Sequence, residues 1–278
     1  IFRGGVMSAM GNPRVSVGLP VYNSENYIAA ALDSILEQSF NDYELIISDN
    51  GSTDGTAEIC RDYAARDNRV RFIQQSENTG VIPNFKFVLD EAVGDYFMWM
   101  AGDDRKTPNF LDLAVKVLDE EEAVGLVFCD TAIIDVTSGE KFGTASFGFT
   151  TSRIKWFRYL FRLHHGGGPA LMYGLHRRKL LLQFNLYSFD YFDVHLSHWY
   201  ELRSQIRVLP LKMHIVGVVG KRVAYSLTGK KLDPSAYLKE EWGLLKANLS
   251  PLIAIIVYVL ARYRITRDAK HSNKQVLK

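Results

Sequence analysis

Short apolar runs alternate with amphipathic segments through the first half of the chain, and this alternation most constrains the fold. Five runs predict strands, and the segments between them have the spacing of helices. Strands are expected at residues 15–21, 43–48, 70–74, 95–100 and 124–129, and helices at 24–38, 53–66, 82–92 and 110–121. Strands that alternate with helices form a mostly parallel sheet with helices on both faces. The predicted fold class is therefore α/β, with a Rossmann-like sheet.

Polar side chains follow four of these predicted strands directly. Tyr22-Asn23 follows the first strand, the stretch 49–54 the second, Asn78 the third and Asp103-Asp104 the fourth. Ligands of open α/β sheets bind beyond the carboxyl ends of the strands. We therefore expect one binding site along this edge of the sheet.

Asp103 and Asp104 are adjacent carboxylates at the point where a buried strand ends. Such a pair is costly unless something neutralises it. A divalent cation held against a diphosphate would do so, since carboxylate oxygens suit Mg²⁺ and Mn²⁺. The alternative is that the pair caps the helix that begins near Pro108. The clusters after the other strands favour the metal site.

Asp49 lies in the segment Ser-Asp-Asn-Gly-Ser-Thr-Asp-Gly. A carboxylate here can accept a hydrogen bond from a pyrimidine ring N–H, and glycines let the backbone approach a flat base. The alternative is an Asx-turn, with Ser52 or Thr53 capping the next helix. The sequence has no Gly-x-Gly-x-x-Gly and no Walker loop, which argues against dinucleotide cofactors and phosphate-loop hydrolysis of nucleotides.

Charge is divided unevenly between the two halves of this 278-residue chain. Residues 1–130 hold 10 Lys or Arg against 22 Asp or Glu, and residues 131–278 hold 23 against 9. The acidic half suits a metal and nucleotide site, and the basic half suits a phosphorylated acceptor or an anionic membrane. No recognition motif accompanies the basic residues, so nucleic acid is not expected as a partner. Cys60 and Cys129 are expected to be free thiols.

Two segments of the second half could contact a membrane. Residues 153–162 are basic and aromatic, as expected of a surface helix with snorkelling arginines or of an interfacial helix. Residues 252–261 are all apolar but shorter than the roughly 20 residues that span a bilayer. Six basic residues follow this run, with Asp268 alone against them. We expect peripheral membrane contact and a cytoplasmic location at the inner face of the membrane.

Four segments together resemble family 2 glycosyltransferases of the GT-A fold. They are Val15–Asn23, Ile47–Thr56, Glu77–Gly80 and Ala101–Asp104, and the resemblance extends over about Arg14–Ser226. It implies transfer of a sugar from a nucleotide sugar, with a divalent metal (Mn²⁺ or Mg²⁺) and inversion at the anomeric carbon.

The resemblance also implies the residues of the donor site. The nucleotide sugar would be bound by Pro20, Tyr22, Asn23, Glu25, Asp49, Asn50, Ser52, Asn78 and Asp103. The metal would be held by Asp104 and Asp103. His214 corresponds to a histidine, late in the sequence of some members, that approaches the metal. Ala101 stands where many members have Asp, which could alter the metal affinity.

An inverting transfer needs a general base that deprotonates the acceptor hydroxyl. The family places this base in a Glu-Asp pair that opens a helix, and here Asp193 aligns with it while Phe192 stands at the Glu position. Asp190 is the reserve candidate, and a plain helix N-cap is the alternative role of Asp193. His195 and His198 are expected to be packing or surface residues.

The complete prediction is a three-part chain. Residues 1–11 are a leader or remnant, residues 12–226 a glycosyltransferase domain, and residues 227–278 a basic helical extension. The expected reaction moves a sugar, most simply from a UDP donor, to a hydroxyl of a glycan or lipid-linked acceptor. Because a Gln-x-x-Arg-Trp processivity motif is absent, one sugar is expected to be transferred per encounter.

A sugar-nucleotide pyrophosphorylase would need a Gly- and Arg-rich loop where Pro20–Asn23 stands. A non-catalytic nucleotide-sugar-binding or scaffold protein is the remaining alternative.

Overall fold

The structure is a computed structural model that describes residues 11–135, 138–146, 152–165, 169–186, 192–218 and 234–262. Residues 1–10 of the expected leader, the expected domain boundary at 226/227 and the reserve base Asp190 lie outside the described residues.

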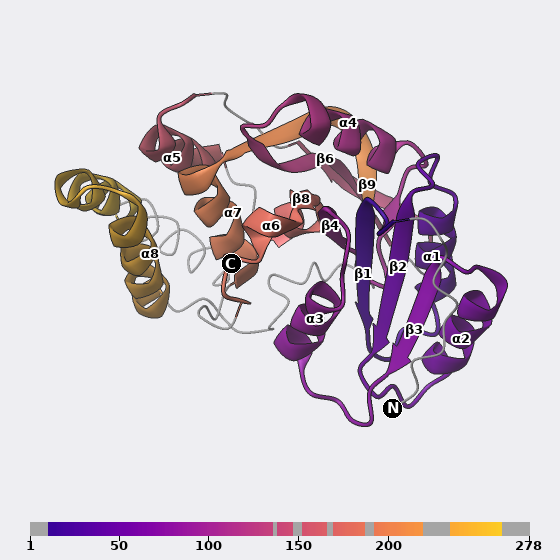
Figure 1. Cartoon of the computed structure of the whole chain (residues 1–278). Coiled ribbons are helices and arrows are strands. Elements are labelled where there is room, and N and C mark those ends of the chain that lie inside the picture. The colour runs from indigo at the N-terminus through magenta and orange to yellow at the C-terminus, as the bar shows by residue number, and fades with distance from the viewer. Residues whose placement is uncertain are drawn as a thin grey trace.

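A nine-stranded mixed sheet forms the centre of the protein (Figure 1). Its strands are β1 (Val15–Val21), β2 (Tyr43–Asp49), β3 (Val70–Gln74), β4 (Tyr96–Trp99), β5 (Arg105–Lys106), β6 (Val124–Asp135), β7 (Lys141–Ala145), β8 (Leu175–Arg177) and β9 (Gln205–Val218). They lie in the order β3-β2-β1-β4-β8-β6-β9-β5, and β7 pairs with β6. Strands β3, β2, β1 and β4 are parallel, whereas β8 runs antiparallel to both β4 and β6. The α/β fold class is confirmed.

Helices cover the sheet and continue beyond it. They are α1 (Ile28–Leu36), α2 (Thr56–Arg66), α3 (Val81–Asp90), α4 (Phe110–Glu120), α5 (Lys155–His165), α6 (Arg178–Leu181), α7 (Phe192–Arg203) and α8 (Pro234–Asn248), with a 3₁₀ helix η1 (Pro169–Tyr173). Residues 251–262 are also helical. Among the described residues, none of these helices combines the length and the apolar character needed to cross a bilayer.

Side chains of β4 show how the sheet separates two cores. Phe97 and Trp99 face one hydrophobic cluster, which includes residues of α3 and α7, while Tyr96 and Met98 face the other, which includes residues of α1 and α4. This alternation follows from the two-residue period of a strand, and burial of both faces is expected for a sheet covered by helices on each side. Cys60 and Cys129 are buried free thiols, as expected.

The second half of the chain departs most from expectation. Helix α7 ends at Arg203, and after Ser204 the fourteen residues Gln205–Val218 form β9, a strand that the sequence did not predict. This strand runs parallel to β6 along its length and antiparallel to the two-residue strand β5. Its polar residues and Pro210 hide the period of two, so only pairing with β6 identifies it as a strand.

Helix α5 is not the snorkelling surface helix that was one of the two alternatives. Arg158 and Arg162 are 5% and 1% exposed, and both pair with the buried carboxylate of Glu201 on α7. Ile154, Trp156 and Phe157 lie exposed at the start of the same helix instead. The basic residues of this segment therefore hold α5 against α7.

Candidate active site

A cleft of about 210 Å³ lies beyond the carboxyl ends of β1 and β4. Its lining includes Pro20, Tyr22, Asn50 and Asp103 from the expected set. It is completed by Val21, Ser24, Tyr27, Val81, Asn84, Phe85, Ala101, Gly102 and Tyr173. The cleft lies at the edge of the sheet where the sequence analysis expected a ligand.

Asp49 ends β2 as a fully buried carboxylate. Its Oδ1 accepts hydrogen bonds from the backbone N–H of Ser52, at 3.1 Å, and from the Ser52 hydroxyl. Its Oδ2 is buried and accepts no hydrogen bond from the described residues. Because an unsatisfied buried carboxylate oxygen is costly, this atom is suited to accept an N–H from a ligand such as a pyrimidine base. The Asx-turn and the binding role are compatible here.

Asn23 and Glu25 brace the loop after β2. Asn23 has a positive φ of 48°, and its Oδ1 accepts the N–H of Thr53 at 2.9 Å. Oε2 of Glu25 accepts the N–H of Gly55 at 2.7 Å. Both predicted binding residues are thus engaged with backbone, so their side chains position the loop around Asp49.

Asn50 and Asn78 join the loops that follow β2 and β3. Nδ2 of Asn50 donates to Oδ1 of Asn78 at 2.9 Å, and Oδ1 of Asn50 accepts the N–H of Thr79 at 2.9 Å. Gly51, which follows Asn50 in the loop after β2, has a φ of +70°. A Cβ at this position would be 2.9 Å from the carbonyl carbon of Glu77 in the loop after β3. The close approach of the two loops therefore requires glycine at this position.

Asp104 lies close enough to Asp103 to affect the ionisation of Asp103. Burial, and then repulsion by Asp104, raise the pKa of Asp103 to about 7. Asp104 is almost fully buried; its Oδ1 accepts the N–H of Gly217 at 3.1 Å, and its Oδ2 lies 3.2 Å from Nε2 of His214.

His214 reaches this site from β9, where it is paired in register with Lys106 of β5. The ring is fully buried and stacks on Tyr173 with centroids 5.8 Å apart. Burial, and then the charge of Lys106, lower the pKa of His214, so the neutral imidazole is favoured. Nε2 faces Oδ2 of Asp104, while Nδ1 has no hydrogen-bond partner among the described residues. Carboxylate and imidazole donors suit Mn²⁺ or Mg²⁺. Of these three side chains only Asp103 lines the cleft, and in the described residues their ligand atoms are not gathered into one group of three.

Two residues of the site were missed by the sequence analysis. Lys106 is buried, its Nζ donates to the carbonyl of Tyr173 at 2.9 Å, and burial lowers its pKa to about 8. Burial raises the pKa of Tyr173, and the carboxylates of Asp104, Asp103 and Asp193 raise it further. The only sequence signal for Lys106 was its position directly after the aspartate pair, and Tyr173 had none.

Asp193 lies in the first turn of α7 and is 1% exposed. Its Oδ1 accepts the N–H of Val194 at 3.0 Å. After the carboxylates of Asp104 and Asp103, that of Asp193 makes the smallest contribution to the raised pKa of Tyr173. The expectation that His195 and His198 are packing or surface residues is wrong in one respect: they are buried, but in ion pairs with Glu240 and Glu241.

Comparison with known proteins identifies the family. Residues 16–176 match the family model described as Glycosyl transferase family 2, so the chain belongs to this family of glycosyltransferases. The chain is 36% identical over 124 residues to the putative glycosyltransferase EpsE of Bacillus subtilis, an alignment that covers 44% of this chain and 45% of EpsE. It is 34% identical over 108 residues to the putative teichuronic acid biosynthesis glycosyltransferase TuaG of the same organism, covering 39% and 43%. The alignments thus span less than half of these curated relatives.

Solved structures share the fold at low sequence identity. TarS of S. aureus, residues 1–349 in complex with UDP, matches with a TM-score of 0.65 and 19% identity, over 88% of this chain and 69% of TarS 1–349. The mannosyltransferase PcManGT of Pyrobaculum calidifontis, in complex with GDP-Man and Mn²⁺, matches with a TM-score of 0.58 and 18% identity, over 91% of this chain and 70% of that one. These matches establish the GT-A fold.

Proposed function

We propose that the chain transfers one sugar from a nucleotide-sugar donor to a hydroxyl of a glycan or lipid-linked acceptor. The observation that supports this proposal is that Asp103 and Tyr173 line the cleft and the buried Asp104–His214 pair lies against them, since Asp104 follows Asp103 and His214 stacks on Tyr173. A transferase needs both halves of such a site: one that stabilises the departing diphosphate and one that deprotonates the acceptor.

The donor is proposed to be a UDP-sugar. Oδ2 of Asp49, which is buried and accepts no hydrogen bond from the described residues, would accept the ring N–H of uracil, with Pro20 and Tyr22 of the cleft lining against the base. Asn50, Ser52 and Asn78 would shape this pocket through the loop contacts described above. TarS, which shares the fold, has been solved with UDP and with UDP-GlcNAc, and PcManGT with GDP-Man, so a guanine nucleotide is the competing donor.

Asp103, Asp104 and His214 are proposed to hold Mn²⁺ or Mg²⁺. When bound, the metal would supply positive charge to the diphosphate of the donor. Asp104 and His214 are held by the backbone of β9 and by stacking on Tyr173, and both are buried, so their donor atoms would have to be uncovered as the metal binds.

Asp193 is proposed to be the general base. As the acceptor oxygen forms its bond to the anomeric carbon, the carboxylate takes the hydroxyl proton, and the bond between that carbon and the diphosphate breaks. Attack opposite the leaving group inverts the anomeric centre. The nucleoside diphosphate leaves with the electron pair of the broken bond, and Asp190 remains the reserve candidate for the base.

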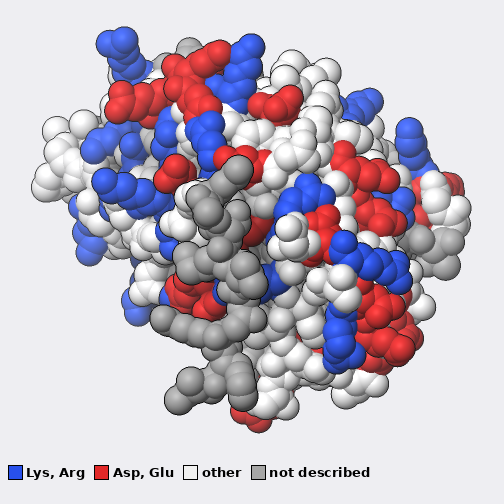
Figure 2. All heavy atoms as spheres, turned by 45° about the vertical axis from the view of Figure 1, so that its right-hand side comes forward, with Lys and Arg blue, Asp and Glu red and all other residues white. Residues whose placement is uncertain are grey.

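The acceptor is proposed to belong to cell-surface polysaccharide synthesis, as the name of the relative TuaG suggests. On the face in Figure 2, acidic side chains form the larger patches at the right and basic side chains are more frequent at the left. A basic second half would favour an acceptor that carries phosphate or is anchored in an anionic membrane.

Contact with the inner face of the cell membrane is proposed for the helix at 251–262. Its side chains at spacings of three and four point to solvent, namely Leu252, Ile255, Ile256, Val259 and Leu260, all at least 50% exposed. Such an apolar stripe followed by basic residues is typical of interfacial helices. Co-sedimentation with anionic and neutral vesicles tests it: Ile255→Ser/Val259→Ser should abolish binding to anionic vesicles, and a wild-type protein indifferent to both would exclude it.

Calorimetric titration tests the donor site. UDP, GDP and CMP are titrated with and without Mn²⁺ into the wild type, Asp104→Ala, and the control Asp112→Ala, which changes an exposed carboxylate of α4. Tight binding of UDP that needs Mn²⁺ and Asp104 but not Asp112 is expected. Failure of every nucleotide to bind would contradict the proposal, and binding without turnover on any acceptor would identify a non-catalytic nucleotide-sugar-binding protein.

A further inference from the structure

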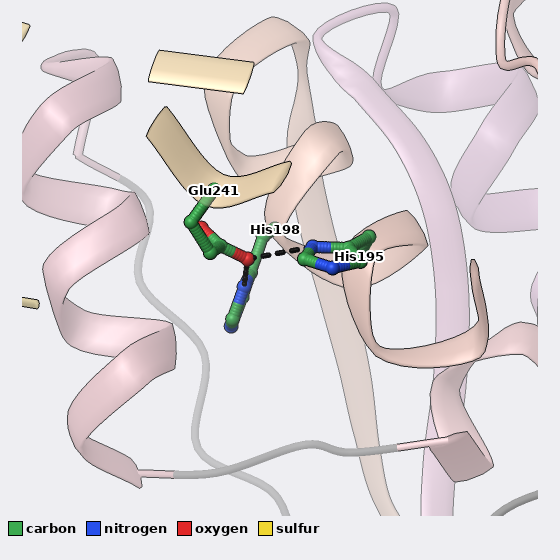
Figure 3. A group of neighbouring side chains, drawn as sticks. All are labelled: His195, His198 and Glu241. Carbon is green, nitrogen blue, oxygen red and sulfur yellow. Dashed lines mark hydrogen bonds and ion pairs between the residues drawn. The ribbon is translucent and has the colours of Figure 1, made fainter. Parts of the chain in front are cut away.

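A buried cluster of two histidines and a glutamate lies between α7 and α8, outside the donor cleft. We call His195, His198 and Glu241 the interhelix cluster; it is shown in Figure 3. Both imidazoles come from α7, three residues apart and therefore on one face of the helix, and the carboxylate comes from α8. The proposed transfer uses none of these side chains.

The two imidazoles converge on a single oxygen atom. Nδ1 of His195 lies 2.7 Å from Oε1 of Glu241, and Nδ1 of His198 lies 2.8 Å from the same atom (Figure 3). All three side chains are buried, and one donor atom from each lies within 4.8 Å of the others. Three donor atoms that converge in a dry interior are what binding of a single metal ion requires.

Neighbouring groups orient the atoms that would not touch the ion. Nε2 of His195 lies 2.7 Å from Oε2 of Glu240, and Oε2 of Glu241 accepts a hydrogen bond from the hydroxyl of Tyr159. Carboxylates behind metal-binding histidines play this part in known metal sites, where they fix the ring and the tautomer.

The buried negative charge of Glu241 must be compensated by a positive charge. This fully buried carboxylate is contacted by Tyr159, His195 and His198, and no lysine or arginine among the described residues pairs with it. The arginines of α5 are instead engaged with Glu201. Either protons on the imidazoles or a metal dication must therefore neutralise the site.

We propose that the interhelix cluster binds a divalent metal of the zinc class, which joins α7 to α8. Two imidazole nitrogens and one carboxylate oxygen are a donor set typical of Zn²⁺ and unlike the carboxylate-rich donor site. With metal–ligand distances of about 2.0–2.2 Å, neighbouring donors in a tetrahedral site are roughly 3.3 Å apart. The cluster would open by only a few tenths of an ångström, and the Nδ1 atoms would give up their protons to solvent as the metal binds.

Co²⁺ is the probe that tests the site, because its visible absorption reports nitrogen ligands and low coordination number. The full chain carrying Asp103→Asn/Asp104→Asn, which removes the carboxylates of the donor site, is stripped with a chelator and titrated with Co²⁺. We expect one equivalent to bind with intense visible bands, to be displaced by one equivalent of Zn²⁺, and to raise the melting temperature.

Further variants on this background assign the ligands. Glu241→Gln should abolish the bands, and Glu240→Gln should weaken Co²⁺ binding by about 10–100-fold, as loss of a supporting carboxylate does. The control is His176→Gln, which changes a buried imidazole on β8 that lies outside the cluster, and it should leave the titration unchanged. Absence of Co²⁺ binding in the Asp103→Asn/Asp104→Asn protein would overturn the proposal, whether or not the other variants fold. So would binding that survives Glu241→Gln. The outcome is independent of nucleotide binding, so the donor-site proposal stands or falls separately.

Discussion

Nε2 of His214 lies 3.2 Å from Oδ2 of Asp104, although β9 and the loop after β4 are far apart in the sequence. The short strand β5 brings them together, because it follows Asp104 directly and pairs antiparallel with β9 so that Lys106 lies opposite His214. The ring then has Tyr173 stacked against it and the lysine charge nearby, and these neighbours keep it neutral and in place.

Removing either partner should weaken the donor-site metal. His214→Gln and Asp104→Asn are each expected to reduce affinity for Mn²⁺ at least about 10-fold, because each removes one donor atom from a small ligand set. The measurement is Mn²⁺ binding by electron paramagnetic resonance in the presence of UDP. Unchanged affinity in His214→Gln would exclude the histidine as a ligand.

Affinity for Mn²⁺ should depend on pH near neutrality. The folded-state pKa of Asp103, about 7, lies above its ordinary value, so the metal-free protein holds a proton there that the ion must displace. Affinity should fall about tenfold per pH unit below 7 and level off above it. The Asp103→Asn variant should bind more weakly and without this dependence. Titrations between pH 5.5 and 8.5, roughly spanning this pKa, check it, and a flat wild-type profile would contradict it.

Asp193→Asn should separate binding from transfer. Loss of a general base lowers turnover by a factor on the order of 10²–10⁴, while binding of donor and metal is unchanged because the amide keeps the size of the side chain. Single-turnover assays and donor titration on the same preparation measure both. Asp112→Asn, in an exposed position of α4, is the matched control and should turn over as wild type does. Full activity of Asp193→Asn would show that Asp193 is not the general base and that another residue has this role.

Gly51→Ala should destabilise the protein more than Gly139→Ala. Both glycines have a positive φ, +70° and +73°, which costs a residue with a Cβ about 1–2 kcal/mol. Only at Gly51 would the Cβ also meet backbone, 2.9 Å from the carbonyl carbon of Glu77, whereas nothing lies within 4 Å of a Cβ at Gly139. Urea unfolding compares the two, and UDP binding should weaken in Gly51→Ala alone. Equal losses would show that the loops do not need the close approach.

Arg162→Met should remove the closer of the two arginines that pair with the buried carboxylate of Glu201, leaving Arg158 at 3.7 Å. Breaking a buried ion pair from one side costs about 3–5 kcal/mol, and adding Glu201→Gln should recover part of this loss. Lys86→Met breaks the more exposed pair with Asp90 and should cost less than about 1 kcal/mol. Denaturant unfolding is measured for the wild type, Arg162→Met, Glu201→Gln, the double variant and Lys86→Met. Additivity of Arg162→Met and Glu201→Gln would argue against a direct interaction.

The local pattern of the first half predicted most of its elements, but not β5, and it ended β6 at residue 129 instead of Asp135. β1 and β3 have the expected bounds, and β2 and β4 are within one residue of them, because each is an apolar run closed by turn residues. Helix α1 starts at Ile28, four residues later than expected, since residues 24–27 form a turn that carries Ser24 and Glu25 to the loop after β2.

The second half needed tertiary contacts. β9 is recognisable only beside β6, and α5 buries arginines that its sequence would place at the surface, since Glu201 of α7 compensates their charge. The sequence showed which polar residues follow each strand. It did not show that the loops carrying them are hydrogen-bonded to one another.

The sequence by itself determined the α/β class, the family and the edge of the sheet at which the cleft lies, because these follow from patterns local to each strand and the turn after it. Only the tertiary structure decided that His214, Lys106 and Tyr173 meet the aspartate pair, and that His195 and His198 converge on Glu241. Such contacts join residues far apart in the chain, and their geometry is set by strand pairing and helix packing, which no local pattern encodes.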